Sequence, residues 1–391
     1  MRILFTCWPA YGHLLPMVPL IRAAQRDGQD VVVSSGADLA ELIRGLDVRV
    51  HTSGVTLAES YARMPDQLTI SELPADQQAG FAAQHLFGAG AVDRARDLLD
   101  LMREWRPDLI VHDTLELGAP TAAIMRGISH VTHGYGPIIP RTDDFTAAIA
   151  KAITDAGLAD PMSAVFAAPY LDVCPPGLHG DHPSPWTTTY PLRPSAGESE
   201  PDALPPAFDA LPHPHTVYVT LGTIMNQNIP VFRAVIDGCA QWPVNLVVTT
   251  GPELDPARLG PLPVAVLAVP FLPQAAVLPR CRAVVSHAGA GTMLGALCFG
   301  LPQLCLPQST DQPYNTAALL PTGAALALQP DEITAERVAD ALGQLLEDPS
   351  FRDAARRLRD QIANMPVAGA VLDVLVRERA GPAHSGGPTR R

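Results

Sequence analysis

Short apolar runs alternate with stretches of helical periodicity along most of this chain. In the first half, each run of strand character is followed by a segment whose apolar residues recur every three to four positions. The strand-like runs cover residues 2–6, 30–35, 48–52, 108–112 and 130–133, and the helical segments cover 17–26, 38–46, 91–104, 118–126 and 142–156. Strands that alternate with helices predict βαβ units and therefore a parallel sheet.

The same alternation returns in the second half of the chain. Strand-like runs cover residues 217–221, 246–250, 264–269, 283–286, 303–307 and 324–328, and helices are predicted at 334–347, 351–363 and 370–379. Prolines crowd the stretch between the two series from about residue 171, which is typical of a semi-rigid linker. We expect an α/β protein with two Rossmann-like parallel-sheet domains, whose ligands bind in a cleft at the carboxyl ends of the strands.

Domain bounds follow from this pattern. We place a first domain at 1–190, a proline-rich linker at 191–213, a second domain at 214–365, a last helix at 366–380 and a disordered tail at 381–391. Residues 54–88 lose periodicity and are expected to form a long irregular loop, either functional or poorly ordered.

Composition narrows the classes of function. A net charge of −13 over 391 residues disfavours nucleic acid and anionic membranes as partners. The six cysteines have neither metal-ligand nor disulfide spacing, so we expect reduced, buried thiols and a cytoplasmic protein. No apolar run reaches the length of a membrane span, and Tyr11-Gly12-His13 and three prolines interrupt the first one, which argues against a signal peptide.

The stretch from Cys281 to Asn315 carries the clearest chemistry. A buried strand leads into a glycine-rich turn (287–291) and then into a helix that we expect to begin at Thr292. Free N–H groups and the positive end of the helix dipole make such a turn an anion site, and Gly289 and Gly291 let a phosphate approach the backbone. His287 would add a neutral or a cationic donor. The alternative is that these glycines only form the turn.

Three further loops follow strands of the second domain and would converge on the same ligand. They supply hydroxyls and a tight turn for phosphate, a flat ring beside an amide for a base and ribose, and a carboxylate beside an amide for sugar hydroxyls. Their residues are Thr220, Gly222 and Thr223; Phe271, Leu272 and Gln274; and Asp311 and Gln312, with His287, Gly289, Gly291 and Thr292 in the turn. Together they indicate a nucleotide sugar. Taken singly, Thr223 and Asp311 would be helix caps and Phe271 a core residue.

The first domain supplies a candidate general base. Gly12-His13 follows the first strand, and Asp113 ends the strand at 108–112, so both side chains are expected at the carboxyl edge of the sheet. A histidine held by a carboxylate can deprotonate a hydroxyl. The alternative is that His13 and Asp113 cap helices. His112 points to the opposite face and is set aside.

At this point the chain resembles the bacterial GT-B glycosyltransferases of family 1 that modify natural products such as enediynes, macrolides and aromatic polyketides. The resemblance covers nearly the whole chain. It rests on Gly12-His13 with Pro16, Leu221-Gly222-Thr223, Pro273-Gln274, the 287–292 motif, Asp311-Gln312, and the closing segment from Asn364, where the family's last helix crosses back to the first domain.

The family implies an inverting transfer without metal or other cofactor. His13, oriented by Asp113, would deprotonate the acceptor hydroxyl. His287, Thr223 and the N–H groups of Gly291 and Thr292 would stabilise the departing diphosphate, while Asp311 and Gln312 would contact the sugar.

Two departures from the family pattern concern the donor. The base-stacking position, commonly tryptophan, is Phe271, and Gly295 stands where many uridine-diphosphate-using members carry a glutamate for the ribose hydroxyls. We therefore expect a thymidine-diphosphate (TDP) deoxysugar rather than a uridine-diphosphate (UDP) sugar.

The acceptor is expected to be a large apolar aglycone. Residues 54–88 and 134–170 should line its pocket, and the side chains singled out are Trp8, Gly12, Phe81, Phe87, Tyr135 and Ile138. Core packing explains these residues equally well. Open alternatives are C- or N-transfer on the same scaffold, an epimerase of GT-B type acting on nucleotide sugars, a silent partner of another glycosyltransferase, and a homodimer.

Overall fold

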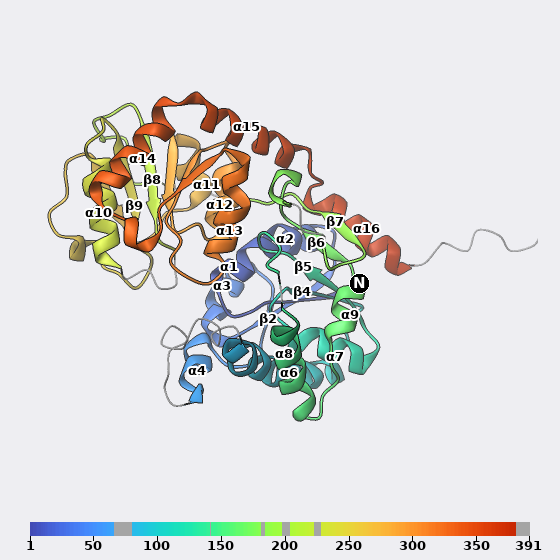
Figure 1. The fold of residues 1–391 in the computed structure, drawn as a ribbon. Coiled ribbons are helices and arrows are strands. Elements are labelled where there is room, and N and C mark those ends of the chain that lie inside the picture. Colours follow the sequence, from blue (N-terminus) through green and yellow to red (C-terminus); the bar gives the residue numbers. More distant parts are fainter. Residues whose placement is uncertain (66–79, 141, 181–183, 198–203, 223–227, 381–391) are drawn as a thin grey trace, which may run out of the picture.

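The computed structural model describes residues 1–65, 80–140, 142–180, 184–197, 204–222 and 228–380. These residues form two lobes, each built on its own parallel sheet with helices on both faces (Figure 1). The predicted fold class, with two Rossmann-like domains, is confirmed. No helix in the described ranges is long and apolar enough to cross a lipid bilayer.

The sheet of the first domain has the strand order β3-β2-β1-β4-β5-β6-β7. Its strands are β1 (Arg2–Thr6), β2 (Asp30–Ser35), β3 (Arg49–Thr52), β4 (Leu109–Asp113), β5 (Ser129–His133), β6 (Tyr170–Asp172) and β7 (Thr189–Pro191). Its helices are α1 (Tyr11–Leu14), α2 (Val18–Arg26), α3 (Ala40–Arg44), α4 (Leu57–Ala62), α6 (Ala89–Glu104), α7 (Gly118–Arg126), α8 (Asp143–Asp155) and α9 (Met162–Ala167), with short turns at η1 (Leu15–Met17), η2 (Ala37–Leu39) and η6 (Pro176–Leu178).

The sheet of the second domain has the order β10-β9-β8-β11-β12-β13. Its strands are β8 (Thr216–Thr220), β9 (Asn245–Thr249), β10 (Val266–Val269), β11 (Ala283–Ser286), β12 (Gln303–Cys305) and β13 (Ala325–Ala327). The helices that follow β7 are α10 (Ile229–Cys239), α11 (Gln274–Val277), α12 (Ala290–Cys298), α13 (Gln312–Leu319), α14 (Ala335–Glu347), α15 (Pro349–Asn364) and α16 (Ala368–Ala380), with turns η7 (Pro206–Phe208), η8 (Pro256–Leu259), η9 (Leu278–Arg280), η10 (Leu320–Thr322) and η11 (Pro330–Glu332).

Three expectations from the sequence need correction. The stretch 54–88 is partly helical: α4 begins with a capping box at Thr56 and Glu59, and π-helical η5 (Ala83–Gly88) runs into α6. The proline-rich stretch contains β6 and β7, which extend the first sheet, and Pro191 ends β7 at the sheet edge. Helix α12 begins at Ala290 rather than Thr292. The tail at 381–391 lies outside the described residues.

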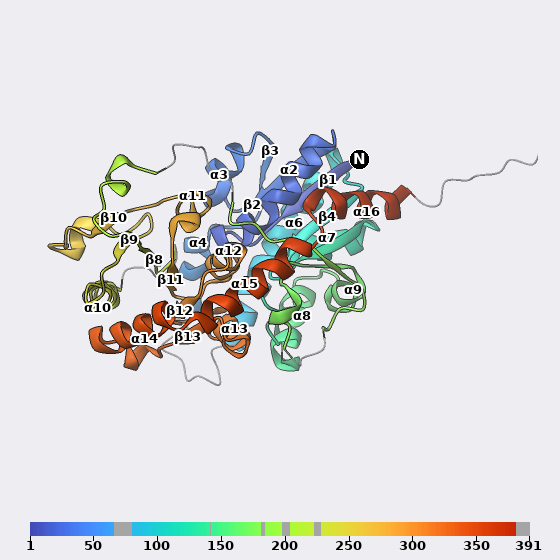
Figure 2. The same ribbon diagram turned by 90° about the horizontal axis from the view of Figure 1, so that it is seen from above.

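The end of the chain ties the two domains together. Helix α15 leaves the second domain and α16 packs against α2 of the first (Figures 1 and 2). Where the chain crosses between the domains, Arg193 N–H donates to the carbonyl of Pro366 at 2.8 Å, and its guanidinium Nε donates to that of Met365 at 3.0 Å. One continuous hydrophobic cluster joins residues of both domains through this helix, from Leu20 and Ile21 in α2 to the apolar face of α16.

The domains also meet at the carboxyl edges of their sheets. A methyl group built on Gly136, in the loop after β5, would lie 2.5 Å from Cβ of Ala290 at the start of α12. The loops that carry the predicted chemistry in each domain therefore face one another.

Candidate active site

The first-domain half of the site is a histidine–aspartate pair. His13 lies in α1 and Asp113 is the last residue of β4, and Nδ1 of His13 is 3.0 Å from Oδ1 of Asp113. Burial would raise the pKa of Asp113, but His13 and the N–H groups of Leu115 and Trp8 outweigh that effect and hold the pKa below its ordinary value. Because the carboxylate is ionised, Nδ1 carries the proton and donates it, which leaves Nε2 of His13 as an acceptor.

Behind this pair lies a buried ion pair that the sequence did not indicate. Nε of Arg94 is 3.8 Å from Oε1 of Glu116, and the guanidinium lies 5.2 Å from the centroid of the Trp8 ring. Glu116 also accepts from the N–H groups of Gly118 and Ala119 at the start of α7. Burial raises the pKa of Glu116 to about 7, although Arg94 pulls the other way. Trp8 is 4% exposed, so it forms an inner wall of the site rather than an open contact surface.

The predicted acceptor residues divide into two groups. Tyr135 lies against the base, with ring centroids of Tyr135 and His13 4.5 Å apart. Phe87 bridges Trp8 and Phe145, at centroid distances of 5.1 and 5.9 Å. These rings form an apolar wall beside the dyad.

The other residues predicted to bind the acceptor are Ile138, Phe81 and Gly12, and they lie in different surroundings. Ile138 packs, partly buried, in the same cluster as Phe87. Phe81 lies against His85 one turn further along its own helix, at 4.6 Å between centroids, and shows no ring contact with the dyad. A side chain at Gly12 would meet nothing within 4 Å, so the space beside His13 is open.

The second-domain half of the site is a glycine cradle around His287. A methyl group on Gly222 would lie 2.6 Å from Nε2 of His287, and one on Gly289 would lie 2.9 Å from Cε1, so only glycines admit the imidazole. Gly222 also has a φ of 88°, in the left-handed region. Burial lowers the pKa of His287 to about 4, although Asp311 acts in the opposite direction, which favours the neutral alternative for the ring. Its Nδ1 is buried and has no hydrogen-bond partner in the described chain.

The residues predicted to hold the base and ribose lie on the loop that ends at α11. Phe271 is 67% exposed, so its ring is available for stacking. The side chain of Leu272 is buried in a hydrophobic cluster, so its predicted contact with the donor would fall to its backbone. Nε2 of Gln274 donates to Oγ1 of Thr292 at 2.9 Å, and this bond links the loop to the first turn of α12.

Two other residues predicted to bind phosphate, Thr220 and Gly291, lie at the turns beside His287. The hydroxyl of Thr220 accepts from the N–H of Gly222 at 3.2 Å and shapes the turn after β8. A side chain at Gly291 would meet nothing within 4 Å, so its backbone faces open space. Thr223 lies outside the described residues.

The loop before α13 is held by its own side chains. Asp311 accepts from Nδ2 of Asn315 at 2.6 Å and from the Thr310 hydroxyl at 3.0 Å. Gln312 turns its Oε1 onto the N–H groups of residues 308 and 309, so its amide supports the loop and its oxygen is already engaged. Asn315 was missed from the sequence, although its position one helical turn after Asp311 was a usable signal.

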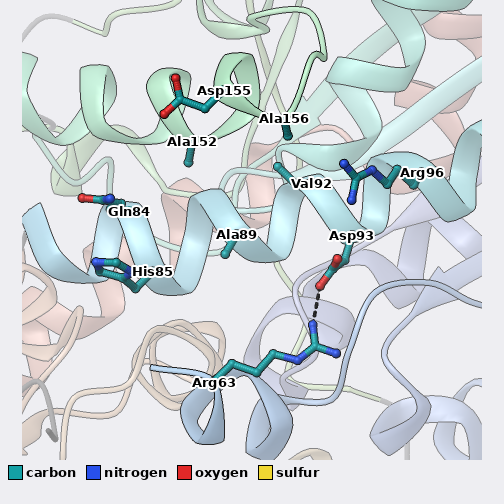
Figure 3. A pocket seen from close by; sticks show the side chains of 10 residues that line it. All are labelled: Arg63, Gln84, His85, Ala89, Val92, Asp93, Arg96, Ala152, Asp155 and Ala156. Carbon is teal, nitrogen blue, oxygen red and sulfur yellow. Dashed lines mark hydrogen bonds and ion pairs between the residues drawn. The ribbon is translucent and has the colours of Figure 1, made fainter. Parts of the chain in front are cut away.

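A hollow of about 500 Å³ lies elsewhere, on the outer face of the first domain (Figure 3). Residues of α6, η5 and α8 line it, and the ion pair between Arg63 and Asp93 crosses its rim at 2.6 Å. None of the predicted site residues lines this hollow. The candidate site therefore consists of the His13–Asp113 pair and the glycine cradle, which face one another across the meeting sheet edges.

Two Rossmann-like domains whose sheet edges meet, joined by a helix that crosses back, define the GT-B class of glycosyltransferases. Two family profiles cover most of the chain: the N-terminal domain of erythromycin biosynthesis protein CIII-like proteins matches residues 20–190, and the C-terminal domain matches residues 233–377. The chain belongs to this family of glycosyltransferases.

Individual relatives agree with that assignment. An L-demethylnoviosyl transferase of Streptomyces niveus is 32% identical, over 97% of this chain and 98% of the relative. An aclacinomycin-T 2-deoxy-L-fucose transferase of Streptomyces galilaeus is 28% identical, over 96% and 95%. The crystal structure of the glycosyltransferase VinC in complex with DTDP superposes with a TM-score of 0.78 at 26% identity, covering 97% of this chain and 100% of the other. The predicted resemblance is confirmed.

Proposed function

We propose that this glycosyltransferase moves a deoxysugar from a TDP-sugar to a hydroxyl group of a large apolar natural-product aglycone, with inversion and without metal. The observation that carries the proposal is the 3.0 Å contact between Nδ1 of His13 and the ionised, buried carboxylate of Asp113.

The base acts through Nε2 of His13. Because Nδ1 donates to Asp113, Nε2 accepts the proton of the acceptor hydroxyl as the oxygen attacks the anomeric carbon. The bond from that carbon to the diphosphate oxygen breaks on the opposite face, and the configuration inverts. The resulting imidazolium is stabilised by the Asp113 carboxylate.

The diphosphate leaves into the cradle at the start of α12. The N–H groups of Gly291 and Thr292 stand in the first turn of this helix, where no intrahelical acceptor is available and the dipole is positive. Neutral His287 supplies one more N–H without adding charge. These donors would stabilise the charge that develops on the leaving group. Asp311, held by a hydrogen bond from Asn315, would contact the sugar hydroxyls.

The preference for thymidine rests on the surroundings of Gly295. A methyl group there would lie 3.0 Å from Oε1 of Gln274 and 3.5 Å from Leu278, and glycine at this position supplies no carboxylate for a ribose 2′-hydroxyl. The relative VinC, crystallised with DTDP, and the relative named for 2-deoxy-L-fucose transfer support the same kind of donor.

Calorimetric titration with TDP and UDP in parallel tests the donor site. We expect TDP to bind more tightly than UDP, and His287→Ala to weaken TDP binding about 10- to 100-fold through loss of a hydrogen bond to a charged group. Equal or tighter UDP binding would contradict the role of Gly295, and binding of neither nucleotide would contradict the nucleotide-sugar donor.

Product analysis tests the rest. Deoxysugar donors are screened against polyketide acceptors, with and without EDTA. A product of inverted anomeric configuration, formed at the same rate in EDTA, is expected. Retention of configuration would contradict the direct attack, and loss of activity in EDTA would contradict metal independence.

A further inference from the structure

A short segment of the first domain, Gly134 to Gly136, connects the two halves of the site. It follows β5 directly, and the ring of Tyr135 lies 4.5 Å from the ring of His13. The next residue, Gly136, is so close to the second domain that a methyl group on it would stand 2.5 Å from Cβ of Ala290. Two neighbouring residues therefore touch the base on one side and the diphosphate turn on the other.

The segment is fixed to the first domain. The N–H of Gly134 donates to the carbonyl of Leu171 in β6 at 2.8 Å, and Nδ1 of His133 donates to the carbonyl of Gly134 at 2.6 Å. A side chain on Gly134 would meet Tyr170 Cζ at 2.8 Å, so the backbone passes directly over that ring. These contacts hold the segment as a rigid extension of the sheet.

The surface that it meets is fixed as well. Ala290 is the first residue of α12, between the glycines of the diphosphate turn. Asn315 donates to the carbonyl of Ala288 at 3.0 Å and to Asp311, so it joins that turn to the sugar-binding loop. Its Oδ1 is buried without a partner in the described chain and would lie 3.6 Å from a methyl group on Gly136.

We propose that Tyr135 and Gly136 are positioning residues that set the distance between the base and the donor. Gly136 is a point where the domains dock, and the absence of its side chain fixes how closely Ala290 approaches. Tyr135 holds the His13 ring in line with that docking point. The inference rests on the proposed function, because it assigns these residues a role in sugar transfer.

The contact permits a methyl-exchange experiment in the full-length chain. Gly136→Ala adds a methyl group 2.5 Å from Cβ of Ala290, which forces the surfaces apart. Ala290→Gly removes the opposing methyl group, and the nearest remaining atom of Ala290, its Cα, would be 3.8 Å away, an ordinary contact. The two single variants and the double variant are compared with the unmodified chain.

Three measurements are made on the four proteins: TDP affinity by calorimetry, the radius of gyration in saturating TDP by X-ray scattering, and kcat and KM with the donor and acceptor pair found by the screen. In Gly136→Ala we expect an increased radius of gyration and a kcat lowered about 100-fold, as for a misplacement of reacting groups by about 1 Å. TDP affinity and the KM for the donor should change less than about threefold. The double variant should regain the compactness and the kcat of Ala290→Gly.

The outcomes separate the inference from the proposed function. Recovery in the double variant supports docking at Gly136, because a defect confined to the first domain cannot be repaired from the second. An unchanged kcat in Gly136→Ala, or a double variant as slow as Gly136→Ala, would overturn the inference. If these proteins still bind TDP, the proposed function is unaffected by that result. If the unmodified chain binds no TDP, the proposed function fails, and the scattering comparison without nucleotide still decides whether Gly136 is a docking point.

Discussion

The candidate site contains two histidines whose Nδ1 atoms differ in hydrogen bonding: one is bonded to a carboxylate and the other has no partner in the described chain. His13 in the first domain has its Nδ1 bonded to a buried carboxylate that takes three hydrogen bonds. His287 in the second domain has a buried Nδ1 with no partner in the described chain and is hemmed in by two glycines. A base must be oriented before its substrate arrives, whereas an anion site must keep donors unsatisfied for its ligand. In the first half a carboxylate orients the ring, whereas in the second half the close approach of two glycines fixes its place.

The largest test removes the oriented base. His13→Gln should lower kcat about 10²- to 10⁴-fold, because a glutamine amide cannot accept the proton. TDP affinity should stay within about twofold, since the donor half is untouched. Steady-state kinetics and calorimetry check both values. A fall in TDP affinity that matches the fall in rate would show that the two halves do not act separately.

Acidification should destabilise both domains, because each contains a buried neutral histidine. Burial lowers the pKa of both His287 and His133 to about 4, against about 6.5 in an unfolded chain. Between these values the unfolded chain binds more protons, so stability is complete above pH 6.5 and is lost as pH falls towards 4, by up to about 1.4 kcal/mol per pH unit for each histidine. Asp113, with its lowered pKa, contributes stability that is lost only at still lower pH.

Denaturant unfolding from pH 7 to 4.5 measures this loss. His287→Gln should reduce the slope of the free energy of unfolding against pH by the contribution of one bound proton, about 1.4 kcal/mol per pH unit. His133→Gln, a matched change in the first domain, should have the same effect. A slope unchanged by either substitution would contradict the neutral buried state of that ring.

Two glycines of the same turn provide a smaller test. Gly289→Ala should lower the free energy of unfolding by about 1–3 kcal/mol, because its methyl group collides with a ring that Gly222 confines from the other side. Gly291→Ala meets open space in the first turn of α12 and should raise it by up to about 1 kcal/mol. Thermal unfolding compares them. Equal effects would show that the His287 ring is free to move.

The smallest expected effect is at the exposed ring. Phe271→Ala should weaken TDP binding by about 0.5–1.5 kcal/mol through lost stacking, with stability unchanged within about 0.5 kcal/mol. Phe271→Trp should strengthen TDP binding. Calorimetry measures both. A large loss of stability in Phe271→Ala would mean that the ring packs against the protein and not against a base.

Much of this fold could be predicted from the sequence, because parallel strands buried on both faces are continuous apolar runs. The strand predicted at 283–286 and the helix at 118–126 match β11 and α7. Strands β6 and β7 could not be found, since both lie in a proline-rich stretch that is typical of a linker, and their place depends on the pairing of β6 with β5 and of β7 with β6. Segment η5 was obscured by its irregular helical period.

The candidate site also has a part that could be predicted from the sequence and a part that could not. His13 and Asp113 could be paired in advance because each follows a strand of a parallel sheet, so their meeting is a consequence of topology. The partnership of Arg94 with Glu116 and the approach of Gly136 to Ala290 depend on how helices and domains pack, which leaves no local pattern in the sequence.

The crossing of α16 has a practical consequence for exchanging parts between related enzymes. The chain leaves the first domain at Arg193 and returns at Pro366, and these two points are joined by a hydrogen bond. In the order of the chain, the second domain is therefore an insertion within the first. Residues 194–365 form a cassette with adjacent ends, so a transplant confined to it would keep α16 on its native partner, whereas a hybrid with one junction in the linker would replace that helix with a foreign one.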